Sequence, residues 1–252
     1  MNNHKTVNLF GIPVEAMTMS QTLDLVDEVI SSRKSLQIGV INAAKVVNME
    51  KDPELREAVL SSDIILADGA AVVWASKLLR SPLPERVAGI DIMFGMFERG
   101  NDKGHRVFCL GATEAISQTV ADNLARDYPG CVLAGRHHGY FTEDEAQSIA
   151  DQIRDSKADI LLVAMTSPKK ERFLAKWMDH MQVPVCHGVG GSFDVYAGKV
   201  ERAPESWQKL GLEWLYRVKQ EPGRLWKRYL FTNLSFLWML LKSMLGFRKA
   251  VA

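Results

Sequence analysis

Short apolar runs alternate along the chain with longer amphipathic stretches, and this alternation limits the possible folds more than any other feature. The runs have the length and β-branched content of buried strands, and the stretches between them have helix length. The runs are Leu36–Ile41, Asp63–Ala67, Arg106–Leu110, Cys131–Ala134, Asp159–Met165 and Val183–His187. Apolar strands separated by helices are typical of a parallel sheet covered on both faces. The sequence therefore predicts a Rossmann-like α/β fold with a mostly parallel sheet.

Size and charge narrow the class of protein. The 252 residues, 47% of them hydrophobic, are enough for one large α/β domain. Lysine and arginine number 31 against 30 aspartate and glutamate, so we expect no nucleic-acid partner, and a membrane would have to be met by a local patch. The polar N-terminus, Met1–Thr6, precedes no apolar segment of signal-peptide length, which predicts a cytoplasmic location.

Neither a disulfide nor a metal site is indicated. Cys109, Cys131 and Cys186 lie in or beside apolar runs without CxxC spacing, so we expect reduced, buried thiols. The six histidines are scattered, and no Asp-x-Asp pair is present to bridge a metal ion and a diphosphate. We therefore expect no metal and no cofactor, with arginines and helix N-termini neutralising a leaving phosphate.

Asp68 is the first candidate catalytic residue, because ligands of an open parallel sheet bind beyond the carboxyl ends of the strands. It directly follows the second apolar run, and Asn42 follows the first. A carboxylate in that place could take a proton from an acceptor hydroxyl as a general base. It could equally be the N-cap of a helix over Gly69–Leu79, and its position leaves both interpretations open.

Small residues at two other strand ends indicate a phosphate or nucleotide site. They are Gly111 and Thr113 after one run, and Gly188, Gly190 and Gly191 after the last. Glycines there allow a phosphate to approach backbone N–H groups, although tight turns without a ligand use the same residues. The last segment is not GxGxxG, because Phe193 stands where the third glycine belongs. That departure disfavours a dinucleotide-dependent dehydrogenase.

The composition changes after about Ala203. The stretch Leu210–Arg228 is rich in tryptophan, tyrosine, lysine and arginine, and Tyr229–Phe247 is nearly all apolar. We therefore divide the chain into an α/β catalytic domain, 1–203, and a helical appendage, 204–252. A basic amphipathic stretch joined to an apolar one favours a helix lying on a membrane over a spanning helix, with contact through about residues 224–247.

Several motifs together resemble the WecG/TagA/CpsF family of bacterial glycosyltransferases, from about Val7 to Tyr229. They are Ile41-Asn42-Ala43-Ala44-Lys45-Val46, Ala67-Asp68-Gly69, Arg86-Val87-Ala88-Gly89-Ile90-Asp91, Ser167-Pro168-Lys169-Lys170-Glu171, Gly188-Val189-Gly190-Gly191-Ser192-Phe193-Asp194, and Arg202-Ala203-Pro204 followed by Leu210-Gly211-Leu212-Glu213-Trp214-Leu215-Tyr216-Arg217. The resemblance implies an inverting transfer of a sugar from a UDP-sugar to an undecaprenyl-diphosphate-linked saccharide, during assembly of a bacterial cell-surface polysaccharide.

The resemblance also implies roles for particular residues. It makes Asp68 the general base and places Asn42 with the loop from Arg86 through Gly89 to Asp91 around the donor or acceptor sugar. Gly188–Asp194 would lie near the nucleotide, with Asp194 on its ribose or uracil. The other motif residues assigned to substrate binding are Lys169, Glu171 and Arg202.

In the family the C-terminal appendage is thought to attach to the membrane and to complete the active site with arginines. The matching residues here are Arg217, Arg224 and Arg228, although each arginine taken alone could simply be solvated. This implies a peripheral protein on the cytoplasmic face of the membrane, and a homo-oligomer is left open. Two departures leave the donor sugar open: Val40 and Lys170 stand where many members carry Thr and Gln.

Two other classes of function are weighed against the glycosyltransferase. A nucleotide-dependent oxidoreductase would use the same strand-end glycines, but it needs the missing third glycine. A non-catalytic, membrane-associated scaffold would keep the core and the appendage without the chemistry. The presence of Asp68, Asn42 and the tail arginines counts against a scaffold.

Overall fold

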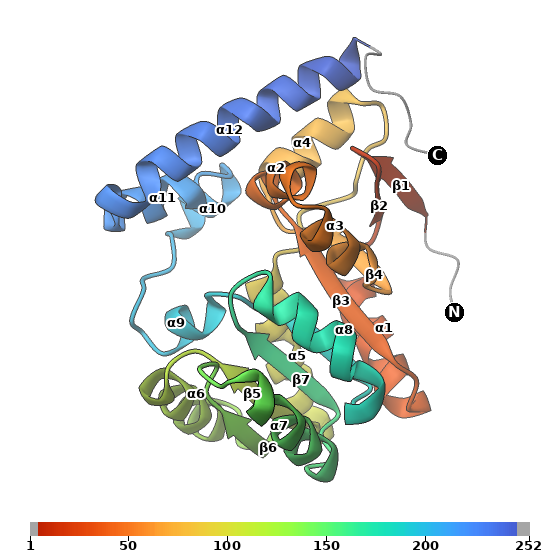
Figure 1. Cartoon of the computed structure of the whole chain (residues 1–252), viewed down its shortest axis with the longest axis vertical. Helices are drawn as coiled ribbons and strands as arrows, with labels where there is room; N and C mark the ends of the chain where they lie inside the picture. The colour runs from red at the N-terminus through yellow and green to blue at the C-terminus, as the bar shows by residue number, and fades with distance from the viewer. Residues whose placement is uncertain (1–4, 246–252) are drawn as a thin grey trace.

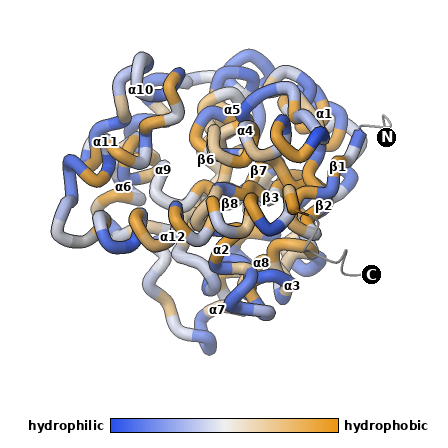
Figure 2. Tube along the Cα trace, turned by 90° about the horizontal axis from the view of Figure 1, so that it is seen from above, coloured by the Kyte–Doolittle hydropathy of each residue, from blue (hydrophilic) through white to orange (hydrophobic). Residues whose placement is uncertain are grey.

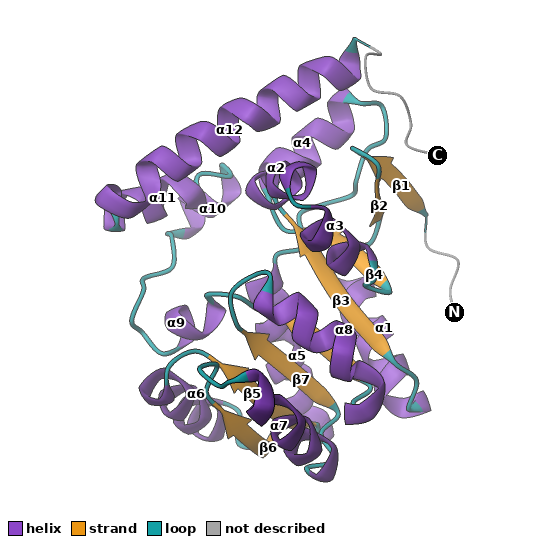
Figure 3. Ribbon diagram, in the orientation of Figure 1, coloured by secondary structure: helices purple, strands orange, loops and turns teal. Residues whose placement is uncertain are grey.

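The computed structural model describes residues 5–245, and the predicted strands are present with small shifts of their ends (Figure 3). Two strands precede them in the chain. The strands are β1 (Thr6–Leu9), β2 (Ile12–Glu15), β3 (Leu36–Ile41), β4 (Ile64–Ala67), β5 (Arg106–Gly111), β6 (Val132–His137), β7 (Ile160–Ala164) and β8 (Val185–Gly188).

Helices separate the strands and continue beyond them. They are α1 (Met19–Ser32), α2 (Ala43–Lys51), α3 (Pro53–Leu60), α4 (Ala70–Leu78), α5 (Gly89–Lys103), α6 (Glu114–Asp127), α7 (Glu143–Asp155), α8 (Lys169–Met181), α9 (Ser192–Tyr196), α10 (Glu205–Lys209), α11 (Glu213–Gln220) and α12 (Pro222–Met244). The regular strand and helix alternation ends with α9, and the three helices after it form the tail of the chain.

Strands β3 to β8 form one six-stranded parallel sheet in the order β4-β3-β8-β7-β5-β6 (Figure 1). The predicted parallel α/β fold is therefore confirmed. Numbered along the chain, this order is 2-1-6-5-3-4, which differs from the 3-2-1-4-5-6 order of dinucleotide-binding folds. The neighbours β3 and β8 lead into α2 and α9, which lie on opposite faces. This reversal marks the crevice where open sheets bind ligands.

The strands alternate their apolar side chains between two faces, and helices cover both. On one face α1, α5, α6 and α9 enclose a core that contains Phe97 and Phe193. On the other face α7 and α8 pack over Phe108 and Leu161, and α2, α3 and α4 form a neighbouring cluster. Figure 2 shows the hydrophobic strands at the centre of these layers. The predicted covering of both faces is confirmed.

The three cysteines are free and buried, as the sequence predicts. Burial raises the pKa of the Cys109 thiol to about 12 and that of Cys131 to about 11. Burial also raises the pKa of Cys186, the third thiol. These thiols therefore stay protonated at neutral pH and serve as small apolar core residues.

The first two strands form an antiparallel hairpin that the sequence analysis did not predict. Thr6 pairs with Glu15 and Leu9 with Ile12, and Phe10 and Gly11 between the strands both have positive φ, 58° and 71°. A two-residue turn of this type matches the twist of a hairpin. The inward side chains of the hairpin join the cluster beneath α2 and α4, and β2 lies against β4.

Helix α12 packs along the catalytic domain through one side. Phe236 and Leu240 are buried in the same cluster as the hairpin. The ring of Phe236 packs edge-on against that of Phe10, with the ring centroids 5.3 Å apart. Helix α2 lies beneath it, and α11 packs beside it. Within residues 5–245, no helix combines the length and the apolar character that crossing a membrane requires.

This packing predicts that Phe236→Ala destabilises the fold. Losing a buried phenylalanine ring costs about 3–5 kcal/mol in comparable cores. Phe231→Ala, on the exposed side of the same helix, should change the free energy of unfolding by less than about 0.5 kcal/mol. Urea unfolding of both variants measures the difference. Equal stability of the two would mean that α12 is not docked as described.

Candidate active site

Asp68 lies where β4 ends and is tied to the start of α5. Its backbone N–H donates to the carbonyl of Ile41 at 2.9 Å, and its Oδ1 accepts a hydrogen bond from the backbone N–H of Gly89 at 3.2 Å. Gly69, not Asp68, is the N-cap of α4, and no side chain caps that helix. The N-cap interpretation of Asp68 is therefore wrong, because its carboxylate is drawn to the next helix. The half-buried carboxylate remains at the ligand edge of the sheet.

Asn42 lies in the adjacent turn, where β3 passes into α2. Its Oδ1 caps α2 by accepting the N–H of Lys45 at 3.0 Å. A Cβ at Gly69 would come within 3.1 Å of the Asn42 Cβ, so the glycine lets the two turns approach closely. The structure thus brings Asp68 and Asn42 together, with Asn42 also serving as a helix cap.

Two lysines share one buried carboxylate beside these turns. The Oε1 of Glu171 lies 3.3 Å from the Nζ of Lys170 and 3.6 Å from that of Lys45, and it accepts the Ser167 hydroxyl at 2.8 Å. Burial, followed by the repulsion of Lys170, lowers the pKa of Lys45 to about 8. Burial opposes ionisation of Glu171, but the two lysines outweigh it and lower its pKa. The cluster has one more cation than anion.

The glycines at the end of β8 and just after it lie near this cluster on one side and near the tail on the other. The side chain of Lys170 packs over Gly188, within 2.6 Å of the position a Cβ would take. Gly190 has open space around it, and an Arg217 Nη1 lies 3.8 Å from the corresponding Cβ position of Gly191. Arg217, an exposed residue of α11, therefore reaches the predicted nucleotide loop.

An ionic network connects the start of α5 with the tail. Arg86 pairs through Nη1 with Glu213, the first residue of α11, and through Nη2 with Asp91 at 3.2 Å. Arg202 pairs with the other oxygen of Asp91. Two guanidinium groups and two carboxylates thus hold the tail against the catalytic domain. The sequence analysis predicted three of these residues and missed the pairing role of Glu213, which lies inside a quoted motif.

The remaining predicted residues lie apart from Asp68. Gly111 is the last residue of β5 and pairs with Ala164 of β7, and Thr113 caps α6 by accepting the N–H of Ile116 at 3.4 Å. Lys169 donates to the carbonyls of Gly139 and Phe141 at 3.0 and 2.8 Å, which holds the start of α8 in place.

Asp194 and two of the tail arginines complete the predicted set. Asp194, in the short helix α9, forms an ion pair with Lys199 at 3.7 Å. Arg228 is exposed on α12, and the side chain of Arg224 lies outside the described part of the structure. Within residues 5–245, no three His, Cys, Asp or Glu side chains gather as a metal would require.

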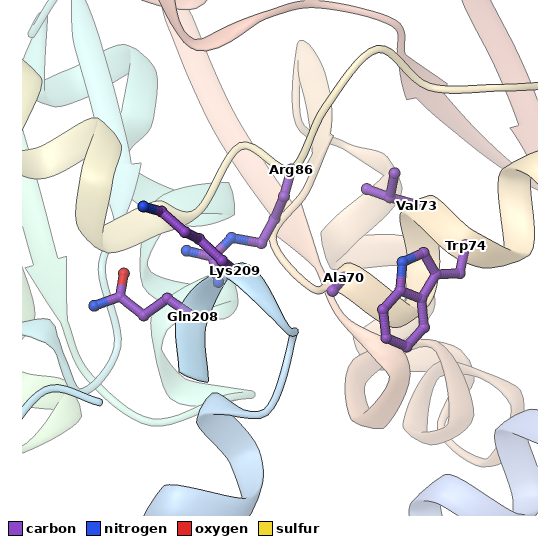
Figure 4. A pocket seen from close by; sticks show the side chains of 6 residues that line it. All are labelled: Ala70, Val73, Trp74, Arg86, Gln208 and Lys209. Atoms are coloured by element: carbon purple, nitrogen blue, oxygen red, sulfur yellow. The ribbon is translucent and has the colours of Figure 1, made fainter. Parts of the chain in front are cut away.

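A cavity of about 350 Å³ opens between α4 and α10 (Figure 4). Its walls are formed by Ala70, Val73, Trp74, Arg86, Gln208 and Lys209. Ala70 begins the helix two residues after Asp68, and Arg86 lies close enough to Asp68 for their charges to interact. The sequence analysis predicted only Arg86 among the lining residues, because the other five lie outside the quoted motifs.

Comparison with known proteins gives the family. The profile of the glycosyl transferase WecG/TagA/CpsF family matches residues 7–250. The chain belongs to this family. It is 40% identical over 175 residues to the N-acetylglucosaminyldiphosphoundecaprenol N-acetyl-beta-D-mannosaminyltransferase of Bacillus spizizenii, a match that covers 69% of this chain and 67% of the relative. As a WecG/TagA/CpsF member it is a glycosyltransferase, which rules out the oxidoreductase.

His187 contacts the residue that holds Asp68. The sequence analysis predicted His187 only as part of a strand. His187 of β8 is fully buried, with Nε2 3.0 Å from the Gly89 carbonyl and Nδ1 3.3 Å from that of Ile38. Gly89 is the residue whose N–H holds Asp68. Burial lowers the pKa of His187 to about 4, so the ring is neutral at physiological pH.

The buried imidazole predicts acid sensitivity. The unfolded state takes up a proton near pH 6.5 and the folded state only near pH 4. The contribution of this group to the free energy of unfolding is therefore complete above about pH 6.5. It decreases as the pH falls and is lost at about pH 4, a total change on the order of 3 kcal/mol. In His187→Gln, urea unfolding between pH 7 and 4.5 should show a smaller decline than in the wild type. Parallel declines would contradict the buried neutral histidine.

Proposed function

We propose that this glycosyltransferase moves a sugar from a UDP-sugar to a saccharide carried on a polyprenyl diphosphate, at the cytoplasmic surface of a bacterial membrane. The donor is a UDP-hexose or UDP-N-acetylhexosamine, and the product enters a cell-surface polysaccharide. The name of the Bacillus relative describes the same class of acceptor. The observation that carries the proposal is the position of Asp68 at the end of β4, two residues before the cavity wall at Ala70 and close enough to Lys45 and Arg86 for their charges to interact.

Asp68 acts as the general base in a single displacement. Its carboxylate takes the proton of the acceptor hydroxyl as that oxygen bonds to the anomeric carbon. The bond from this carbon to the UDP oxygen breaks, and its electron pair leaves with UDP, which inverts the configuration. The hydrogen bond from Gly89 holds one carboxylate oxygen and thereby fixes the direction of the group. No metal or cofactor takes part in the proposed reaction.

The leaving UDP lies at the glycine loop after β8. Gly190 leaves open space for a ligand, and Arg217 from the tail reaches the neighbouring Gly191. A guanidinium group binds a diphosphate with two parallel hydrogen bonds and offsets the charge that grows on it. Lys170, which packs over Gly188, adds a second cation on this side.

The exposed side of α12 is the proposed membrane contact. Its exposed apolar side chains recur mostly at three-residue intervals: Leu230, Phe231, Leu234, Leu237, Trp238 and Leu241, with Leu245 directly after the helix. This stripe lies opposite the residues docked on the catalytic domain, and Lys227, Arg228 and Lys242 accompany it. An apolar stripe beside cations suits a helix lying in the headgroup region of anionic lipid.

A donor panel tests the proposed reaction as a whole. The purified protein is incubated with several UDP-sugars and an N-acetylglucosaminyl diphosphate on a short alkyl chain, and the product is identified by mass. We expect one donor to be converted with a mass increase of one sugar. Absence of any product from all donors, in protein that binds UDP, would contradict the proposed acceptor class.

Asp68→Asn should lower kcat by about 10²- to 10⁴-fold, because the amide cannot accept the acceptor proton. The affinity for UDP, measured by calorimetry, should stay near that of the wild type. Asp102→Asn, at an exposed aspartate near the far end of α5, is the matched control and should be fully active. Near-normal turnover by the Asp68 variant would reject the base.

The double variant Leu234→Gln, Leu241→Gln should bind anionic liposomes about 100-fold more weakly. Each exposed leucine contributes at least about 1.5 kcal/mol when it enters the lipid, so two contribute about 3. Transfer to a full-length polyprenyl acceptor in liposomes should fall, while transfer to a short soluble acceptor stays unchanged. The control pair Val132→Gln, Leu133→Gln changes exposed residues on the opposite edge strand, β6. Equal sedimentation of both pairs with liposomes would exclude α12 as the contact.

A further inference from the structure

The cavity between α4 and α10 has the features of a binding site. The roles proposed above for the donor and for Asp68 do not use this cavity. Its volume of about 350 Å³ lies in the range of small-molecule sites. It lies near Asp68, because its walls include Ala70, two residues after Asp68, and Arg86, whose charge interacts with that of Asp68. One wall comes from the catalytic domain and the other from the tail, so the cavity exists only while α10 is docked.

The wall on α4 presents a tryptophan to solvent. The indole of Trp74 is 54% exposed, and one edge lies near the turn at Gly211. A Cβ at Gly211 would come within 2.6 Å of Ala70 and 3.5 Å of the Trp74 ring, so only glycine allows the tail to approach so closely. The C–H face of a pyranose packs well on such an exposed aromatic ring.

The wall on the other side carries polar and cationic groups (Figure 4). Lys209 is exposed and has only a loose pair with Glu205 at 3.5 Å, a contact of little energetic value. Gln208 donates through Nε2 to the Ala203 carbonyl at 2.6 Å, which leaves its side-chain oxygen for a sugar hydroxyl. Arg86 adds a guanidinium group at the inner end, beside Asp68.

We propose that this cavity is the acceptor subsite, an inference that rests on the proposed function. Trp74 is the platform for the acceptor sugar, which places its hydroxyl toward Asp68, and Lys209 binds the diphosphate. The lipid chain leaves past Leu78, which is exposed one helical turn beyond Trp74. In this proposal the donor lies at the glycine loop after β8 and the acceptor lies against α4.

Calorimetry with two soluble probes separates the two walls. The first probe is an N-acetylglucosaminyl diphosphate on a short alkyl chain, and the second is the same alkyl diphosphate without the sugar. Trp74→Ala should lower the affinity for the first probe by at least about tenfold, as expected for an aromatic hot spot, and leave the affinity for the second probe unchanged. Trp74→Phe should restore most of the affinity. Lys209→Ala should weaken both probes.

Controls and kinetics keep the inference apart from a general loss of structure. The affinity for UDP should be unchanged in every variant, and Trp74→Ala should raise the acceptor KM with little change in kcat. Tyr140→Ala, at an aromatic side chain that is 75% exposed on a distant loop, should bind both probes normally.

Two results would overturn the acceptor subsite alone. One is wild-type affinity of Trp74→Ala for the sugar-bearing probe, and the other is an equal loss of UDP binding, which would make the cavity part of the donor site. A wild-type protein that binds UDP but neither probe, and transfers to no acceptor, would instead refute the proposed function and the subsite with it.

Discussion

The pairing of Arg86 with Glu213 and Asp91 is the interaction on which the arrangement of the site depends. Arg86 belongs to the loop before α5, Asp91 to the first turn of α5 and Glu213 to the start of α11. Because Arg202 neutralises the second oxygen of Asp91, the network is balanced with two cations and two anions. Partly buried charges are costly when unpaired, so this balance favours the docked position of the tail. The cavity wall on α10 and the approach of Arg217 to the glycine loop follow from it.

A second set of contacts fixes the reacting end of the site from beneath. His187 reaches the carbonyl of Gly89 from the middle of the sheet, and the N–H of the same residue holds Asp68. The neutral imidazole has one N–H to give, and each ring nitrogen faces a backbone carbonyl. The direction of the carboxylate is thus set by the sheet itself, independently of the tail.

The fold was predictable where it depends on local pattern, and the site only where residues follow strand ends. Short apolar runs identified β3 to β8, because strands covered on both faces are mostly apolar. The edge strand β6 was found in the same way, although its residues are exposed or half-buried. The hairpin was missed because buried and exposed residues alternate along β1 and β2, so neither strand forms a continuous apolar run. Strand-end position found Asp68 and Asn42, but it could not decide that Gly69 rather than Asp68 caps α4. The cavity residue Trp74 carries no sequence signal, because its role arises from contact with a turn more than a hundred residues away.

The two sides of the tail make different contacts. The side of α12 that bears Phe236 and Leu240 completes the cluster of the hairpin, while α10 and α11 bring Lys209, Glu213 and Arg217 to the site. The opposite side of α12 is left with an apolar stripe that water does not favour. A tail rigidly joined to both the domain and a lipid surface would hold the acceptor cavity at a constant height above that surface. A diphosphate anchored by its lipid could then reach Lys209 and Asp68 without leaving the membrane.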